Sequence, residues 1–493
     1  MNLMEVAAPM NGRQPAPYAI SQWPDTGRLY ERLDALVRAP IRSIPPERMA
    51  KVMEYFETKC RRSKELAAAA LDVVPGGVQH NLAFNYPFPL AIEGAAGAHL
   101  WDADRNRYID FLQAGGPTLL GSNYAPVREK IVELLQQCGP VTGLFHEYEA
   151  RLAELVRCYM PAAEMFRMLG SGTEAVMAAI RLARAFTGKK WIVKIGGAYH
   201  GWSDQMVYGM RIPGTGRHEA HGIPRGSTRH TQECYPNDLA ALRRKLRWNR
   251  IRGGTAAVLV EPLGPESGTR PVEFEYNPRV RELCDEFGAL LVFDEVVTGF
   301  RVGLGGAQGY FGVAPDLTVL GKCLTGGYPM AGALCGRKEV MMRLAGGIGG
   351  SGGKRVFVGG TLSANPLSCA AGYHALLEMD RTNAPRKAGL AGDRLCRGLC
   401  EIIERLKLPY VAYNQGSIVH LQTTGVLLMS ARNPLKLVRE AHQRKRAMEE
   451  MGAAYTAHGI ITLAGSRMYT SMADTDEVID EALNRFESAL RLV

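Results

Sequence analysis

Between residues 125 and 375, short apolar segments alternate with longer segments of helical spacing. The clearest apolar segments lie at 191–195, 256–261 and 290–293. Parallel strands need crossover connections, usually helices, and strands that helices cover on both faces are apolar throughout. The alternation therefore predicts an α/β fold in which helices cover both faces of a mostly parallel central sheet.

The chain is long enough for more than one domain and for a core that needs no disulfides. Its first 27 residues are polar and contain four prolines, which predicts an arm. Helices are expected at 29–37, 46–71, 384–406 and 475–492, and a hairpin around the turn at 102–106. The predicted parts are an N-terminal extension (1–50), the N-terminal part of a small domain (51–124), a large cofactor-binding domain (125–375) and the C-terminal part of a smaller α+β domain (376–493).

Two residues that follow apolar segments suggest a particular chemistry. Asp294 ends the segment at 290–293, and Lys322 follows a second apolar run 28 residues later. A lysine can form an imine with a carbonyl cofactor, and a carboxylate can keep a pyridine nitrogen protonated. Ligands of parallel sheets lie beyond the carboxyl ends of the strands, where Asp294, Glu261 and the loop with Tyr199 should meet. Pyridoxal phosphate needs both the lysine that forms the imine and the carboxylate that protonates its ring nitrogen.

A phosphate cradle is predicted in the sequence Met168-Leu-Gly-Ser171-Gly172-Thr173-Glu-Ala175. Glycines free the backbone at a turn, and the start of the following helix presents free N–H groups and a positive dipole end to an anion. The alternative is that Ser171 and Thr173 only cap the helix. The order of cradle, Asp294 and Lys322 favours the cofactor site over the cap.

These motifs resemble those of class III pyridoxal-phosphate-dependent aminotransferases, above all the glutamate-1-semialdehyde 2,1-aminomutase branch. The resemblance runs from about residue 64 to the C-terminus and implies the fold type I architecture of aspartate aminotransferase. The motifs that carry it include Ser171-Gly-Thr-Glu-Ala, Ala198-Tyr-His-Gly201, Glu261-Pro262, Asp294-Glu-Val-Val-Thr-Gly-Phe-Arg301, Leu320-Gly-Lys322 and Gly360-Thr-Leu-Ser-Ala-Asn-Pro366.

The resemblance implies roles for individual residues. Lys322 would hold the resting cofactor as an internal aldimine and then act as the base, while Asp294 would pair with the pyridine nitrogen. Tyr199 would stack on one face of the ring. Val296 would press on the other face, since it lies two residues after Asp294 on an extended chain.

Two further residues are expected near the cofactor. His200 would be a neighbouring contact, although a purely structural histidine is an equal alternative. Thr361 matches the family residue that reaches the cofactor phosphate of the neighbouring subunit, which implies a homodimer with shared active sites.

The chain departs from the aminomutase pattern at three places. Ala114-Gly115 stands where the pattern has a Ser-Trp pair, and residues 79–83 contain no arginine to bind a substrate carboxylate. A late gating glutamate is replaced at Gly465. These changes put the intramolecular isomerisation in doubt and leave the cofactor chemistry untouched.

Two residues favour ordinary transamination. In class III transaminases a glutamate after the Glu-Pro motif can mask an arginine that binds the donor α-carboxylate, and Glu266 and Arg467 match these positions. The alternative is that they are unrelated surface charges. The predicted function is therefore amino transfer from a donor amino acid to a carbonyl acceptor. Glutamate-1-semialdehyde aminomutase, or a racemase or decarboxylase on the same scaffold, are the alternatives.

Composition bears on location and partners. Ten cysteines are scattered without a Cys-x-x-Cys pair, which predicts reduced thiols in a cytoplasmic protein and no zinc site. No apolar run is long enough to cross a membrane. The net charge is +10, but the basic stretch at 243–252 carries leucines at helical spacing, which indicates a solvated helix face and no nucleic-acid site.

Overall fold

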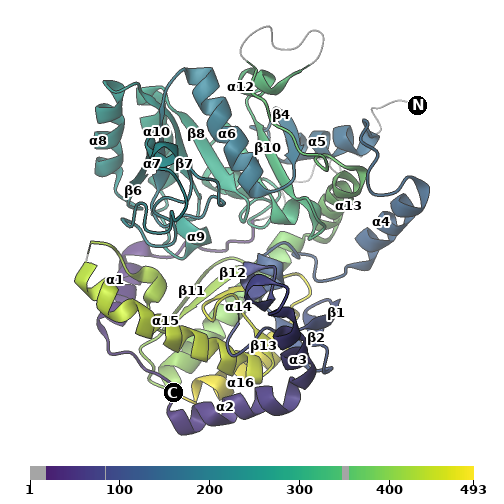
Figure 1. Cartoon of the computed structure of the whole chain (residues 1–493), viewed down its shortest axis with the longest axis vertical. Coiled ribbons are helices and arrows are strands. Elements are labelled where there is room, and N and C mark those ends of the chain that lie inside the picture. The colour runs from purple at the N-terminus through teal and green to yellow at the C-terminus, as the bar shows by residue number, and fades with distance from the viewer. Residues whose placement is uncertain (1–17, 84, 347–354, 433) are drawn as a thin grey trace. The chain divides into compact units, whose positions relative to one another are not determined.

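The computed structural model describes residues 18–83, 85–346, 355–432 and 434–493 (Figure 1). The arm predicted for the first 27 residues lies largely outside this range. The described residues form two compact units. The large unit contains Tyr18 and residues 125–383 and 430–432, and the small unit contains residues 19–124, 384–429 and 433–493.

A seven-stranded sheet forms the centre of the large unit. Every strand of this sheet except β10 runs in the same direction, and β10 is antiparallel to both of its neighbours. The mostly parallel sheet predicted from the alternation is confirmed. In spatial order the strands are β4 (Met165–Leu169), β10 (Gly332–Gly336), β9 (Leu317–Leu320), β8 (Leu290–Glu295), β7 (Thr255–Val260), β5 (Trp191–Ile195) and β6 (Thr231–Cys234).

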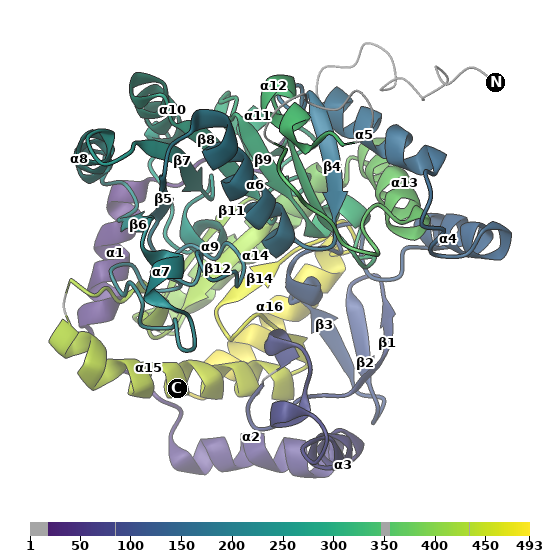
Figure 2. The same cartoon turned by 45° about the horizontal axis from the view of Figure 1, so that its top comes forward.

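Helices cover both faces of this sheet. The helix α6 (Gly172–Thr187) lies across the strands in both views (Figures 1 and 2) and contacts β4, β7, β8, β9 and β10. Leu290 and Val292 of β8 belong to the apolar cluster beneath α6, while the alternating Leu291 and Phe293 are buried on the opposite face. The remaining helices are α4 (Ala125–Gln137), α5 (Glu147–Tyr159), α7 (Arg225–Thr228), α8 (Leu239–Arg250), α9 (Pro265–Gly268), α10 (Tyr276–Phe287), α11 (Gly306–Phe311), α12 (Lys338–Met341) and α13 (Pro366–Thr382).

The small unit combines two short sheets with six helices, as expected for an α+β domain. One sheet has the order β1 (Ile92–Ala96), β2 (His99–Asp102), β3 (Arg107–Asp110) and β13 (Ile460–Ile461), and the other β11 (Val411–Gln415), β12 (Ile418–Gln422) and β14 (Arg467–Tyr469). The helices are α1 (Thr26–Arg38), α2 (Pro46–Lys59), α3 (Arg61–Ala70), α14 (Ala384–Arg405), α15 (Pro434–Ala457) and α16 (Asp476–Leu490). None of the described helices has the length and apolar character needed to cross a membrane.

The single helix predicted at 46–71 is broken at Cys60, which has φ −123° and ψ 38°. The carboxylate of Asp104, in the hairpin turn, accepts hydrogen bonds from the backbone N–H groups of Arg62 and Ser63, at 2.9 and 3.2 Å. These donors would otherwise bond carbonyls one turn earlier in a continuous helix. A tertiary contact thus stabilises a second helix start.

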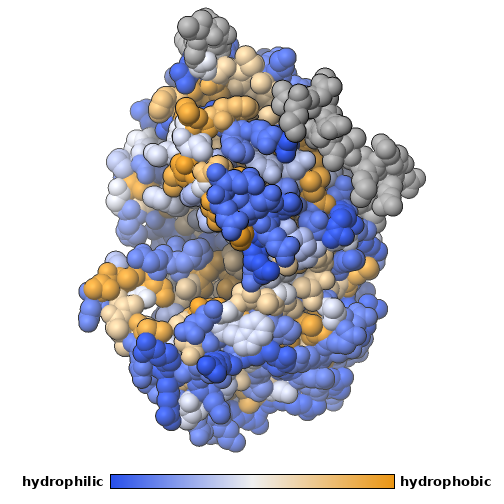
Figure 3. Space-filling model, turned by 90° about the vertical axis from the view of Figure 1, so that its right-hand side faces the viewer, coloured by the Kyte–Doolittle hydropathy of each residue, from blue (hydrophilic) through white to orange (hydrophobic). Residues whose placement is uncertain are grey.

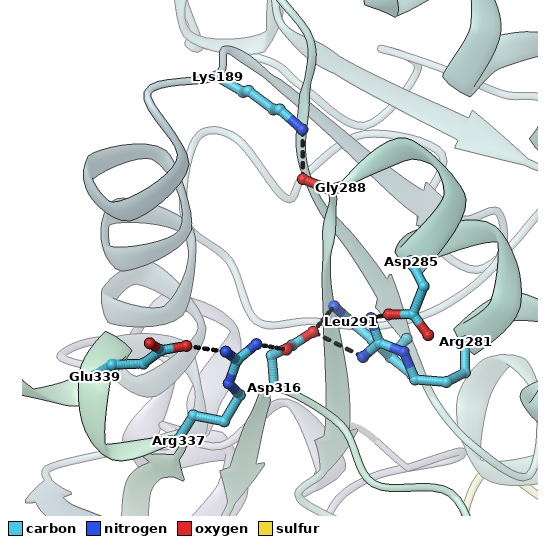
Figure 4. A network of polar contacts seen from close by, with 8 residues as sticks. All are labelled: Lys189, Arg281, Asp285, Gly288, Leu291, Asp316, Arg337 and Glu339. Carbon is cyan, nitrogen blue, oxygen red and sulfur yellow. Dashed lines mark hydrogen bonds and ion pairs between the residues drawn. The ribbon is translucent and has the colours of Figure 1, made fainter.

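Asp316 fixes the amino end of β9, the strand that leads to Lys322 (Figure 4). Its buried carboxylate accepts hydrogen bonds from the backbone N–H of Leu291 and from the guanidinium groups of Arg281 and Arg337, each at 2.7 Å. The carboxylate therefore holds β8 and β9 in register at the edge where β9 begins.

Asp316→Ala should lower the thermal unfolding midpoint by about 3–5 °C. The change leaves the N–H of Leu291 and the largely buried Arg281 without this acceptor, a loss of about 3 kcal/mol. Arg337→Ala is the matched control, because the Arg337 side chain is 45% exposed and its ion pair should contribute less than about 1 kcal/mol. Scanning calorimetry of the three proteins measures the difference, and equal midpoints for both variants would contradict this role of Asp316.

Candidate active site

Five loops of the large unit carry the candidate residues, and each loop follows the carboxyl end of a parallel strand. Ligands of parallel sheets bind at this edge. The residues are Ser171 after β4, Tyr199 after β5, Glu261 after β7, Asp294 at the end of β8, and Lys322 after β9.

The start of α6 presents the backbone N–H groups of a capped first turn. The Ser171 hydroxyl accepts a hydrogen bond from the N–H of Glu174 at 3.3 Å, so Ser171 is the cap that the sequence suggested. Gly172 and Thr173 are the first two helical residues, and their N–H groups have no acceptor within the helix. Glu174 turns back and accepts from the N–H of Gly170 at 2.9 Å, which fixes the turn before the helix. Ser171 therefore caps the helix, and the binding of a phosphate at this turn stays a prediction.

The Val296 side chain packs against both the start of α6 and the loop that carries Lys322. A Cβ placed on Gly172 would lie 2.8 Å from Cγ2 of Val296, and one placed on Gly321 would lie 3.1 Å from Cγ1. Both glycines are thus needed for the close approach of the valine. Lys322, which follows Gly321, is partly buried and has φ +45°, an uncommon value for a residue with a side chain. This backbone strain is typical of functional sites.

Asp294 is fixed by two donors. Its Oδ2 lies 2.7 Å from Nδ1 of His200, and its Oδ1 accepts from the N–H of Val296 at 3.1 Å. Burial lowers the pKa of His200, while the hydrogen bond and charge of Asp294 act in the opposite direction. The short contact indicates that Nδ1, the ring nitrogen that faces the carboxylate, carries a proton. His200 therefore orients Asp294, which is 5% exposed.

Glu261 positions the loop of Tyr199. Its buried carboxylate accepts from the N–H of Tyr199 and from the N–H of Glu266, each at 3.0 Å, and also from Ser267. Burial, followed by the nearby Asp294 charge, raises the pKa of Glu261 to about 7. The Tyr199 side chain remains 44% exposed and available to a ligand. In the same loop, a side chain on Gly201 would overlap Thr173, so this loop lies directly against α6.

Of the other predicted residues, Thr361 and Glu266 belong to the large unit and Arg467 to the small unit. Thr361 is exposed in the turn before α13, and a Cβ on the adjacent Gly360 would lie 3.7 Å from Oε2 of Glu174. Glu266 has φ +48° in the turn that Glu261 holds. Arg467 belongs to β14 of the small unit, where its guanidinium donates to the Tyr469 hydroxyl at 3.4 Å. The masking of Arg467 by Glu266 stays a prediction.

Two departures from the aminomutase pattern have a structural cause. Gly465 has φ +66°, and a Cβ there would lie 2.6 Å from the carbonyl oxygen of Met448. Gly115, of the Ala114-Gly115 pair, has φ +87°, and a Cβ there would lie 2.9 Å from Cδ1 of Leu82. In this structure a side chain at position 465 would therefore collide with the backbone of Met448.

The sequence predicts no role for two residues of the cluster. Glu261 is expected at the ligand edge and in the Glu-Pro motif, and the structure adds that it holds both the Tyr199 loop and the Glu266 turn. Lys194 lies inside β5 and is completely buried. A lysine inside an otherwise apolar strand of a parallel sheet was the available signal, because lysine is rarely fully buried without a partner.

The residues present fit pyridoxal phosphate. The start of α6 offers backbone N–H groups to a phosphate, and Gly172 leaves room where a side chain would collide with Val296. The oriented carboxylate of Asp294 suits a protonated ring nitrogen. Lys322 supplies the amine and Tyr199 a half-exposed ring.

Comparison with known proteins agrees with this geometry. The class III aminotransferase profile matches residues 83–490. Similar solved structures include an omega-transaminase from Sphaerobacter thermophilus, with 28% identity over 88% of this chain and 98% of that one and a TM-score of 0.77. A beta-phenylalanine aminotransferase from Variovorax paradoxus has 27% identity over 90% of this chain and 96% of that one, also with a TM-score of 0.77.

A glutamate-1-semialdehyde aminomutase from Pseudomonas aeruginosa PAO1 shares the fold, at 23% identity over 94% of this chain and 99% of that one and a TM-score of 0.77. The fold type I architecture expected from the motifs is confirmed. The chain belongs to the class III aminotransferase family and is a pyridoxal-phosphate-dependent transaminase.

Proposed function

We propose that this transaminase moves an amino group from a donor amino acid to a second carbonyl compound, with its active site at the carboxyl edge of the large-unit sheet. The observation that carries the proposal is the convergence at this edge of an anion-binding helix start, the oriented Asp294–His200 pair and Lys322. Each is a group that pyridoxal phosphate requires.

Each residue of the cluster has a proposed task toward the cofactor. Ser171, Gly172 and Thr173 would hold the phosphate at the start of α6. Asp294 would keep the ring nitrogen protonated, supported from behind by His200. The ring itself would lie between two side chains, Tyr199 on one face and Val296 on the other.

When bound, pyridoxal phosphate supplies an electron sink for the carbanion that forms at the substrate α-carbon. Lys322 would hold the cofactor at rest. After the substrate amine displaces it, the free Lys322 amine would move the proton at the α-carbon.

Transfer between two molecules is favoured over rearrangement within one. The similar structures with more than 25% identity include the omega-transaminase and the beta-phenylalanine aminotransferase. The turn at Gly465 has no room for the gating glutamate that the aminomutase pattern expects. A screen for the amino donor of this enzyme should accordingly include α-amino acids, β-amino acids and simple amines.

A labelled donor distinguishes the possible reactions. We expect ¹⁵N from a donor amino acid to appear in a second, initially unlabelled carbonyl compound, with a reversible absorbance change of the cofactor in each half-reaction. Glutamate 1-semialdehyde that retains its own nitrogen as it becomes 5-aminolevulinate would identify the aminomutase instead. Release of CO₂ or inversion without transfer would identify a decarboxylase or a racemase.

Arg467→Ala should lower kcat/KM for a glutamate-like donor by roughly 30- to 1,000-fold and barely change it for simple amines. The reason is the loss of a charge-assisted contact with the donor α-carboxylate, about 2–4 kcal/mol. Glu266→Ala should impair neutral substrates instead, because Arg467 would stay unmasked toward them. Steady-state kinetics with paired donors test both variants, and an Arg467→Ala enzyme that treats glutamate like the wild type would refute this role.

The homodimer is also a proposal. The large unit exposes apolar side chains in two loops, with Leu144 80% and Phe145 76% exposed in one and Phe357 73% exposed in the other. The N–H of Leu367 donates to the carbonyl of Pro140 at 3.4 Å, so the first turn of α13 meets the loop after α4. Figure 3 shows apolar side chains at the surface of the face that it draws.

Large apolar side chains exposed in this way are typical of a protein interface. Thr361 lies in the same exposed segment, as the family role toward a neighbouring subunit's phosphate would require. Light scattering of the holoenzyme gives the mass in solution, and a monomer would refute shared active sites. A cytoplasmic location also stays a proposal, supported by ten cysteines that are all free thiols.

A further inference from the structure

Lys194 is a buried cation beside the proposed site. It lies in β5 and its exposed fraction is 0%. Burial lowers its pKa to about 8, so the ammonium is still mostly protonated at pH 7. A buried ammonium carries a large desolvation cost, and proteins rarely keep one without a specific partner.

The acceptors of this ammonium bracket the Tyr199 segment. Nζ donates to the carbonyl oxygen of Ala198 at 2.8 Å and to that of Met206 at 3.4 Å. Tyr199, His200 and Gly201 lie between these two carbonyls. The Lys194 side chain therefore links the two ends of the segment that contains the half-exposed Tyr199 and His200, the residue that orients Asp294.

The segment needs such a clamp because the connection around it is long. Residues 196–224 contain no helix or strand apart from one isolated bridge between Gly197 and Met210. Connections of this length are uncommon in compact domains. The carboxylate of Glu233 holds a later part of the same connection through the N–H groups of Gly214 and Gly216, at 2.8 and 2.9 Å.

The ammonium of Lys194 also interacts electrostatically with several nearby carboxylates. The carboxylates that act on its ammonium belong to Glu233, Glu261, Asp294 and Glu219, in decreasing order, and they come from β6, the ends of β7 and β8, and the loop after β5. Glu261 and Asp294 repel each other, and this repulsion helps raise the pKa of Glu261. A fixed cation reduces the cost of keeping both carboxylates ionised.

We infer that Lys194 is a positioning residue of the transaminase reaction: its ammonium clamps residues 198–206 beneath the cofactor site and offsets the charges of Glu261 and Asp294. The inference rests on the roles proposed for Tyr199 and Asp294. Lys194 acts through those residues and touches neither substrate nor cofactor.

Two variants separate clamping from simple packing. Lys194→Met keeps the length of the side chain but has neither charge nor donor, and Lys194→Arg keeps both. Lys190→Met is the matched control, since Lys190 is exposed just before the same strand. Should Lys194→Met aggregate, Lys194→Leu, which likewise has neither charge nor donor, takes its place in every measurement.

The first measurement is hydrogen exchange of the cofactor-free proteins. We expect peptides that cover 198–206 to exchange at least about tenfold faster in Lys194→Met than in the wild type, while peptides from β7 and β8 stay protected. Lys194→Arg and Lys190→Met should resemble the wild type. Unchanged exchange in Lys194→Met, or equal loss of protection throughout the large unit, would overturn the inference.

The second measurement is activity of the cofactor-loaded enzymes. Misplacement of a group by about 1 Å can cost on the order of 100-fold, so kcat of Lys194→Met should fall by roughly 10- to 100-fold, with partial recovery in Lys194→Arg. Faster exchange with unchanged kcat would overturn the inference. Tyr199→Ala tests the proposed site independently: if that variant keeps full activity the proposed role of Tyr199 fails, whatever Lys194 does.

Discussion

Lys322→Ala should abolish transamination and leave a folded protein that still binds pyridoxal phosphate without a covalent bond. Proton transfer by a positioned side chain contributes about 10²- to 10⁴-fold by itself, and the same amine also holds the cofactor. We therefore expect kcat to fall by at least about 10⁴-fold. The anion site at α6 and the Asp294–His200 pair do not depend on Lys322, so cofactor binding should weaken without being lost.

Borohydride reduction of the holoenzyme and peptide mapping locate the reactive lysine. The cofactor should be found on the peptide that contains Lys322, and the reduced enzyme should be inactive. Lys338→Ala, which removes an exposed lysine at the start of α12, is the control and should keep full activity. A label on any other lysine, or measurable turnover by Lys322→Ala without added amine, would refute the assignment.

Asp294→Asn should lower kcat by on the order of 10³-fold or more. The amide has nearly the same shape and can still bond His200, but it lacks the charge that keeps the ring nitrogen protonated. A 10³-fold loss corresponds to about 4 kcal/mol of transition-state stabilisation, the usual scale for a buried electrostatic contact.

Stopped-flow absorbance of the first half-reaction measures this step directly. Asp285→Asn is the control, because it makes the same chemical change at an exposed position on α10. Asp294→Glu keeps the charge and should recover part of the rate. A half-reaction of normal speed in Asp294→Asn would show that the carboxylate does not act on the ring nitrogen.

The sequence predicts the parts of this site that are local. The apolar segment before Asp294 and the Gly-Ser-Gly-Thr turn are short-range patterns, and the structure has a buried strand and a capped helix there. The family match then confirms the fold and the cofactor. The individual roles of Lys322, Asp294 and Tyr199 stay predictions until the variants are measured.

The remaining features depend on contacts between distant residues. The break at Cys60 arises because Asp104, more than 40 residues away, binds the N–H groups at the start of α3. The helix α15 was not predicted at all, and its Arg444 is buried because its guanidinium reaches the carbonyl oxygens of Val37 and Thr424. Glu261 shows the same limit, since its partners come from two loops.

Asp316 and Lys322 lie at opposite ends of β9, and an extended chain rises roughly 3.3 Å per residue, so about 20 Å separates them. The two edges of the sheet can therefore be altered separately in protein engineering. Substitutions that strengthen the ion pairs around Asp316 should raise heat tolerance without changing substrate preference. Mutant libraries aimed at new amine acceptors can be confined to the loops at the carboxyl edge, near Lys322. The residues around Asp316 can then be left unchanged, so that they continue to stabilise the fold.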